Sequence, residues 1–189
     1  MPDTQENKVQ FSFKNVYYAL LNDGTKATWE TPVPIPGGVD LSLEFEGEIN
    51  KFYADGVVFY QSPSDSGYSG SATFARIPEQ MLKDVWGFEE DETDFVLTEK
   101  AGVEPKPFAL LFQIDGDKNN QLYCWYNCSA TKPSVTAETT TDTKEPTTQE
   151  LAIAVAPLQD GRIKASTTAK TPSNIRENWF KKVYEKVAM

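Results

Sequence analysis

The amino-acid sequence predicts a mainly β fold, a β-sandwich or partly open barrel with one short flanking helix, a long inter-strand loop and a C-terminal helical segment. Three observations support this class. Residues 39–49 alternate between apolar and polar side chains, other short runs rich in β-branched and aromatic residues are bounded by Gly, Pro, Asn and Asp, and helical signals are confined to two stretches. The length of 189 residues suffices for one well-cored domain, so we expect residues 1–189 to form a single domain.

The alternating strand at 39–49 has an unusually acidic polar face. Because side chains of a strand point to opposite faces in turn, its odd-numbered residues form an apolar face with Leu41, Leu43 and Phe45 at its centre. The opposite face consists of Asp40, Ser42, Glu44, Glu46 and Glu48. A returning strand over residues 68–77 places Ser69, Ser71 and Thr73 together on one of its faces. Neighbouring carboxylates repel one another, so this row is not explained by stability alone.

The remaining elements follow from turn residues and periodicity. Asn22-Asp23-Gly24 predicts a hairpin turn, and residues 78–87 predict a short helix because Pro78 suits its first position and Gly87 the residue after its end. We expect the stripe Met81, Leu82, Val85 and Trp86 to pack on a sheet. Further strands are expected over residues 9–21, 25–31, 95–98, 107–115, 121–130, 149–157 and 162–167.

Three segments outside the expected core suggest contacts with other molecules. Residues 49–67 are predicted as a long loop, and residues 132–148 as a polar arm rich in Thr, Glu and Pro. The 49–67 loop carries the apolar residues Phe52, Tyr53, Val57, Val58, Phe59 and Tyr60.

The C-terminal segment, residues 171–189, is predicted to be helical from a capping Thr171 onward, with apolar residues at helical spacing. Its apolar residues include Trp179, Phe180, Tyr184 and Val187. Docking on its own sheet and docking on a neighbouring subunit both remain open.

The composition argues against an enzyme. Histidine is absent, which removes the commonest general base, and no phosphate-binding loop or complete metal motif is present, so no cofactor is expected. Residues 115–120 resemble the start of a calcium loop but lack its glycine and glutamate, so a polar turn is expected. Cys124 and Cys128, four residues apart on one strand, are expected on the same face, too far apart for a disulfide and buried as free thiols.

The net charge of −10 is unevenly distributed. Residues 162–189 hold seven Lys or Arg and two Glu, about +5, which leaves about −15 for the remainder. Such a pattern favours head-to-tail contacts between copies of one protein. The polar, acidic N-terminus has no signal-peptide pattern and no run of 18 apolar residues occurs, so we expect a protein made in the cytoplasm and no membrane contact.

Several segments, in order over almost the whole chain, resemble the major tail proteins, or tail tube proteins, of long non-contractile-tailed bacteriophages (siphophages). The segments are residues 31–38 (TPVPIPGG), 41–47 (LSLEFEG), 52–55 (FYAD), 67–70 (GYSG), 77–78 (IP), 106–112 (KPFALLF), 126–130 (YNCSA) and 178–180 (NWF).

The resemblance implies a tail-tube fold, six copies per ring, and rings stacked into the tube of a virion tail assembled in the cytoplasm of the host bacterium. It implies contacts with the tape-measure protein, the tail terminator and distal tail proteins, and passage of genomic DNA without specific binding. Under this reading the lumen-facing candidates are Asp40, Ser42, Glu44, Glu46, Glu48, Ser69, Ser71 and Thr73. The inter-ring candidates are Phe52, Tyr53, Val57, Val58, Phe59 and Tyr60, and the C-terminal docking candidates are Trp179, Phe180 and Tyr184.

A different function remains compatible with the same composition. Exposed aromatic residues beside carboxylates are also typical of a β-sandwich adhesin or carbohydrate-binding module. A carboxylate hydrolase is disfavoured, because an open strand face does not provide the apolar setting that raises the pKa of a catalytic acid.

Overall fold

A computed structural model describes residues 6–137, 139 and 146–186 of the chain. Within them a nine-stranded sheet dominates, and its main path runs β2-β1-β8-β9-β10-β5-β4, with β3 also paired to β1 and β11 to β9. These strands are β1 (Gln10–Asp23), β2 (Thr28–Trp29), β3 (Val33–Ile35), β4 (Gly38–Ala54), β5 (Val57–Phe74), β8 (Phe108–Gly116), β9 (Gln121–Ala130), β10 (Gln149–Val155) and β11 (Lys164–Ser166). The remaining elements are helix α1 (Glu79–Trp86), the paired strands β6 (Glu89–Glu90) and β7 (Leu97–Thr98), and helix α2 (Ser173–Asn178).

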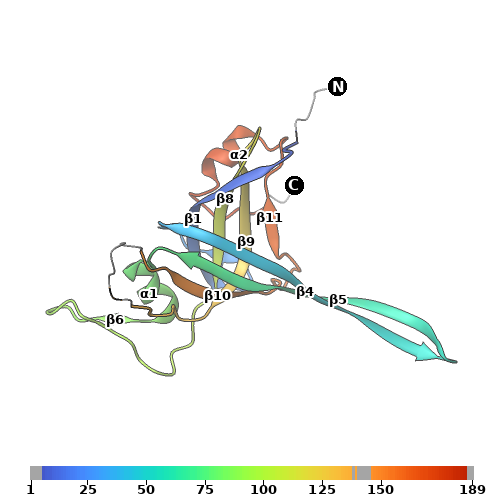
Figure 1. Cartoon of the computed structure of the whole chain (residues 1–189), viewed down its shortest axis with the longest axis horizontal. Helices are drawn as coiled ribbons and strands as arrows, with labels where there is room; N and C mark the ends of the chain where they lie inside the picture. Colours follow the sequence, from blue (N-terminus) through green and yellow to red (C-terminus); the bar gives the residue numbers. More distant parts are fainter. Residues whose placement is uncertain (1–5, 138, 140–145, 187–189) are drawn as a thin grey trace.

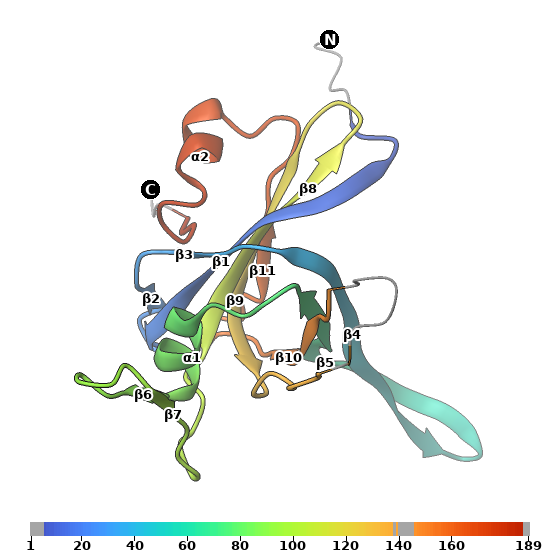
Figure 2. The ribbon, with the colours of Figure 1, turned by 60° about the vertical axis from the view of Figure 1, so that its left-hand side comes forward.

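The sheet curls without closing (Figures 1 and 2). Its bend lies at β9, whose residues 128–130 pair with β10 while its residues 123–125 pair with β11. The start of β4 returns toward β1, where a Cβ atom on Gly38 would lie only 2.8 Å from the Phe13 ring. The prediction of a mainly β, partly open barrel is therefore confirmed.

The inside of the curl holds the larger apolar core. Alternate residues of β1, β5, β8, β9 and β10 point into it, and α1 covers one end with Met81, Val85 and Trp86. The Trp86 indole N–H donates to the Ala130 carbonyl at 3.1 Å, which ties this helix to β9. The helix ends where Gly87 adopts a left-handed φ of 66°. The Gly87 N–H donates to the Lys83 carbonyl at 3.1 Å and the Phe88 N–H donates to the Leu82 carbonyl at 3.2 Å, which satisfies the last carbonyls of the helix. The predicted helix is thus confirmed, and Met81, Val85 and Trp86 of its four-residue apolar stripe are buried.

A second apolar cluster lies on the outer face of β1, β8 and β9. It contains Leu111 and Leu122 from the sheet, and Trp179 and Val183 from the chain after α2. The strands β8 and β9 are consequently buried on both faces, which explains their almost continuous apolar sequence.

The two cysteines lie on opposite faces of β9, so the expectation that they share a face is wrong. Between the Phe108–Cys128 pair and the Leu110–Trp125 pair the register shifts, because two residues of β9 lie opposite one residue of β8, so β9 carries one extra residue. This irregularity turns Cys124 toward the outer cluster and Cys128 toward the inner core. Both thiols are free and buried, as predicted.

We expect both thiols to resist labelling until the protein unfolds. Burial raises the pKa of the Cys128 thiol to about 12 and also raises the pKa of the Cys124 thiol, so neither forms the reactive thiolate at neutral pH. Because the folded pKa values exceed the unfolded value of about 8.5, the free energy of unfolding should fall as pH rises from about 8.5 toward 12. Thiol titration against urea concentration checks the first point. Immediate reaction in the native protein would contradict the burial of both groups.

Candidate assembly surfaces

The polar face of β4 lies beside the polar face of β5. Asp40 is opposite Thr73, Ser42 is opposite Ser71, and Glu44 is opposite Ser69, so all six side chains share one face. The alternating residues Leu41 and Leu43 pack instead against the inner core. On the other side of β5, Glu150, Ala152 and Ala154 of β10 continue the same face. The result is an outward surface of small and acidic side chains.

Glu46 and Glu48 continue this face across an irregularity. Glu46 accepts a short hydrogen bond from the Ser69 hydroxyl, so its carboxylate stays beside the other acids. Between Glu46 and Gly47 the register shifts, because Ser66 is an extra residue on β5. Glu48 therefore lies beyond the bulge, where its N–H donates to Ser64 Oγ at 3.2 Å. The acidic row begins on the sheet and ends on the segment that projects from it.

The predicted 49–67 loop is instead a regular β-hairpin. On β5, only residues 68–74 pair with β10, and from Gly67 outward β4 is the one strand among the described residues that pairs with β5. We call residues 47–65 the arm, which projects from the body in both ribbon views (Figures 1 and 2). At its tip Asp55 and Gly56 both have positive φ, 53° and 78°, as a two-residue hairpin turn requires. At position 63, β4 is the one strand among the described parts of the chain that pairs with β5, and such edge positions are where a sheet tolerates proline.

The arm exposes large apolar side chains on both faces. Phe59 is 72% exposed, and the other members are between 44% and 63% exposed. The set consists of Ile49, Phe52, Tyr53, Val57, Val58, Phe59 and Tyr60. An isolated two-stranded hairpin is marginally stable in water, and a continuous apolar surface of this kind marks a site of contact. All six inter-ring candidates therefore belong to a surface with no cover among the described residues.

The C-terminal segment docks on its own sheet. Trp179 is 2% exposed and its indole N–H donates to the Tyr123 carbonyl at 3.1 Å. Phe180 stacks on Tyr17 with ring centroids 4.8 Å apart. Tyr184 stacks on Trp179 at 5.4 Å. Of the two docking alternatives, the structure shows the intramolecular one.

The predicted C-terminal helix is present but shorter than its apolar spacing indicates, because α2 ends at Asn178 and turns follow. Thr171 does not cap it; its hydroxyl instead accepts from the Thr168 N–H at 2.9 Å. Val187 lies outside the described residues, as do 138 and 140–145 of the predicted polar arm. The described residues of the 132–148 segment have no regular secondary structure, and Lys132 forms an ion pair with Glu99.

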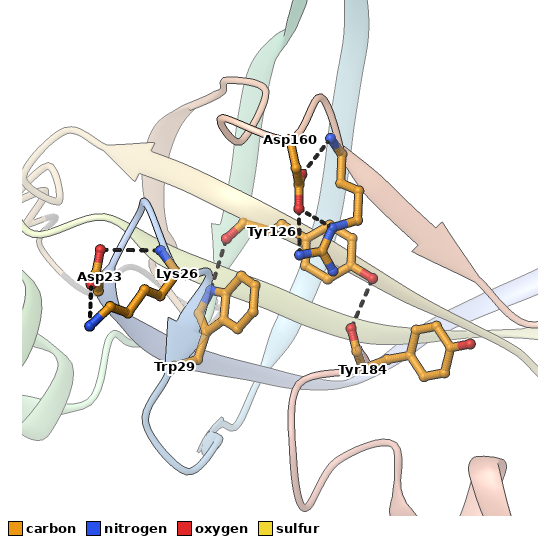
Figure 3. A network of polar contacts seen from close by, with 7 residues as sticks. Asp23, Lys26, Trp29, Tyr126, Asp160 and Tyr184 are labelled. Atoms are coloured by element: carbon orange, nitrogen blue, oxygen red, sulfur yellow. Dashed lines mark hydrogen bonds and ion pairs between the residues drawn. The ribbon is translucent and has the colours of Figure 1, made fainter. Parts of the chain in front are cut away.

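Polar contacts hold the C-terminal segment and the neighbouring loops together (Figure 3). The Tyr126 hydroxyl donates to the Tyr184 carbonyl at 2.9 Å, and the Trp29 indole donates to the Tyr126 carbonyl at 3.0 Å. Arg162 lies over the Tyr126 ring, 5.1 Å from its centroid, and forms an ion pair with Asp160 at 2.7 Å. The hydrogen bonds from Arg162 hold the pKa of the Asp160 carboxyl below its usual value. Burial raises the pKa of Tyr126, so its hydroxyl remains a donor.

A pocket among the described residues is lined mainly by polar side chains, some of which form structural hydrogen bonds. Its volume is about 740 Å³, and it lies between the start of β1, the β8–β9 turn and the chain before α2. Arg176 at its wall donates to three backbone carbonyls, those of Thr168, Asn120 and Thr171. No cluster of His, Cys, Asp and Glu suited to a metal occurs among the described residues, and none of their helices is long and apolar enough to cross a membrane.

Exposed apolar residues also occur where the sequence analysis expected none. Val9 and Phe11, at and before the start of β1, are 50% and 68% exposed. Phe95, between β6 and β7, is 73% exposed with a positive φ of 55°. Val9 and Phe11 alternate with polar residues, as in a half-buried strand, so the sequence alone predicts them to be core residues.

The fold thus defines a mainly β protein with one curled sheet and a projecting hairpin. No family model matches the chain, and no curated protein matches it. Among solved structures the chain is similar to the tube-terminating cap of the anti-feeding prophage, determined by cryo-EM. The TM-score is 0.36 at 16% sequence identity, with 89% of this chain and 99% of that chain covered.

Proposed function

We propose that this protein is a structural virion protein that polymerises as stacked hexameric rings into the tube of a phage tail. The observation that carries the proposal is the arm, a regular hairpin whose apolar side chains are not covered by any described residue of their own subunit. In a stack of rings, the arm of one copy buries these side chains against a copy in the next ring. The resemblance of the sequence to major tail proteins supports the same assignment.

The edge of the sheet favours lateral assembly. Strand β4 is the last strand on its side, and β5 is its only strand partner among the described residues. Unpaired N–H and C=O groups along such an edge are a template for a strand from another copy. A contact of this head-to-tail kind closes into a ring when the rotation between copies is a fraction of a full turn.

The acidic face of β4 and β5 suits a channel wall. When six copies are arranged in a ring, Asp40, Glu44 and Glu46 would form rows of negative charge around the bore. Such a wall repels phosphates, whereas a basic wall would retain DNA through phosphate contacts. The proposal therefore assigns this face to the lumen, where the tape-measure protein lies during assembly and the genome passes during ejection. The tail terminator and distal tail proteins would bind the two ends of the tube.

Electron microscopy of the purified protein tests the proposal directly. Rings or tubes with a central hole are the expected result at high protein concentration. Dispersed monomers under all conditions would contradict it, and monomers that also bind glycans would favour the adhesin instead.

Charge reversal tests the lumen assignment separately from assembly. With Glu44, Glu46 and Glu48 replaced by Lys, we expect tubes to assemble and genome ejection to slow by about tenfold at low salt, because lysines would bind the passing phosphates. Ejection should recover as salt is raised. The matched control replaces the exposed Glu92, Asp94 and Glu104 by Lys, the same charge change on other surfaces. Equal ejection rates in both variants would remove these residues from the channel wall.

A further inference from the structure

Three aromatic rings and one lysine meet where the arm joins the body; we call them the root cluster, Phe45, Tyr68, Trp125 and Lys164. Phe45 and Tyr68 pack edge to face with ring centroids 5.6 Å apart, and Tyr68 packs in the same way on Trp125 at 4.6 Å. The Lys164 ammonium lies 4.5 Å from the Tyr68 centroid and 4.8 Å from the Trp125 centroid. It also donates to the Tyr68 hydroxyl at 3.0 Å.

The root cluster lies at the point where β5 leaves the sheet. Tyr68 is the last residue of β5 paired with β10, through Val155. The next residue, Gly67, has a φ of 106°, and a Cβ atom there would lie 1.9 Å from the Val155 carbonyl oxygen. The extra residue Ser66 follows directly. A bulge of this kind bends a strand, so the direction of the arm is decided within these three residues.

Lys164 connects this bend to the centre of the body. It belongs to β11 and lies opposite Trp125 of β9 in the pairing of those strands. Its ammonium therefore contacts a buried ring of the body and the ring of the strand that carries the arm at the same time. Cations are attracted to the faces of aromatic rings, most strongly to tryptophan.

Burial of Trp125 leaves a polar group without a hydrogen bond to any described residue, which costs free energy. Its ring is 6% exposed, and its indole N–H has no hydrogen-bond partner among the described residues. A buried tryptophan usually finds such a partner. What this tryptophan does offer is its ring, which packs edge to face with Tyr68 and lies below the Lys164 ammonium.

We infer that Lys164 is a positioning residue that fixes the direction in which the arm leaves the sheet. Beyond the bulge the two strands of the arm pair with each other and with no other described strand, so without the root cluster this two-stranded ribbon would swing about its bend. The inference deepens the proposed function, because the arm tip must reach a defined place on the next subunit. The positioning itself is a property of the single chain.

The experiment measures the direction of the arm in monomers, at a concentration where sedimentation shows no assembly. Spin labels are placed on the arm through Lys51→Cys and on α1 through Gln80→Cys, both exposed positions, while Cys124 and Cys128 are buried. In the protein with an intact root cluster, pulsed electron paramagnetic resonance should give one narrow distribution of the distance between the two labels. Lys164→Met should broaden it, and amide exchange in residues 66–68 should accelerate roughly fivefold.

Two variants and a control decide the outcome. Lys164→Arg retains a cation that stacks on aromatic rings and should keep the narrow distribution. Lys170→Met removes an exposed lysine outside the root cluster and should change nothing. An unchanged narrow distribution in Lys164→Met would overturn the inference. Tube formation is scored in parallel. If Lys164→Met has a broad distance distribution and still forms normal tubes, the positioning role is upheld and stacking through the arm is contradicted. If the parent protein has a narrow distribution and forms no tubes, the proposed function alone is contradicted.

Discussion

A protein with a shortened arm should remain folded and fail to polymerise. The change deletes residues 51–54 and 57–61 and leaves the sequence Asn50-Asp55-Gly56-Ser62, so the last pair of the shorter hairpin is the native Asn50–Ser62 pair. It removes all six inter-ring candidates and keeps the turn residues. Because the deleted side chains lie outside both apolar clusters, we expect an unfolding temperature close to that of the parent protein. Calorimetry and electron microscopy of the same sample measure the two properties.

Point variants separate loss of the apolar surface from loss of length. Phe59→Ser removes a ring that is 72% exposed from the arm, and Phe95→Ser removes a ring that is 73% exposed from the β6–β7 connection. We expect Phe59→Ser to raise the protein concentration needed for assembly and Phe95→Ser to leave it unchanged. Tubes of normal length from the shortened protein would remove the arm from the ring-to-ring contact.

Replacing Trp179 by Ala should destabilise the monomer more than any change on the arm. The substitution opens a cavity beneath the C-terminal segment and removes the hydrogen bond to the Tyr123 carbonyl. Truncation of a buried tryptophan costs about 3–5 kcal/mol of the free energy of unfolding. Urea denaturation followed by circular dichroism measures this value.

The controls for this substitution retain part of the contact. Trp179→Phe keeps much of the buried area and should lose less stability than Trp179→Ala, and Phe180→Ala, at a half-buried ring, should also lose less. A loss below about 1 kcal/mol for Trp179→Ala, the range of ordinary surface changes, would mean that the segment is not part of the folded subunit in solution. Docking on a neighbouring subunit would then be the better interpretation.

Features specified by neighbouring residues could be predicted from the sequence. The alternation over 39–49 identified the strand, because a period of two is a local property. It also identified the core-facing side at Leu41 and Leu43, whereas Phe45 and Ile49 on the expected apolar face are 56% and 63% exposed because the strand leaves the body there. The helix at 79–86 likewise follows from Pro78, Gly87 and an apolar stripe between them. These elements needed no knowledge of the rest of the chain.

In the arm, the sequence contains a hairpin signal, but neighbouring residues favoured a different prediction. Asp55-Gly56 between two apolar runs is a strong hairpin signal, yet the run from Ser62 to Gly67, with its proline and serines, favoured a loop. The structure accommodates that run because the strand has an open side there. Sequence alone does not state which strands lack a neighbour.

Other differences arise from contacts between distant residues. Trp179 and Val183 have the spacing of a helix face, but turns deliver both to the outer cluster once the segment docks on β9. The opposite burial of the two cysteines depends on a register shift against β8, which the sequence of β9 does not reveal. The root cluster was missed for the same reason, since Lys164 and Tyr68 are 96 positions apart.

The arm also has a consequence for the order of events during folding. It closes through the two-residue turn at Asp55-Gly56, and such hairpins form within about 1–10 μs. The body must instead join strands that are remote in the chain, as in the pairing of Gln10 with Gly116, and sheets with such long-range contacts fold in about milliseconds to seconds. Under the proposed function, the arm of a newly made chain can therefore form before the surface that would bind it is folded. The rate at which bodies fold would then set the rate at which tubes begin to grow.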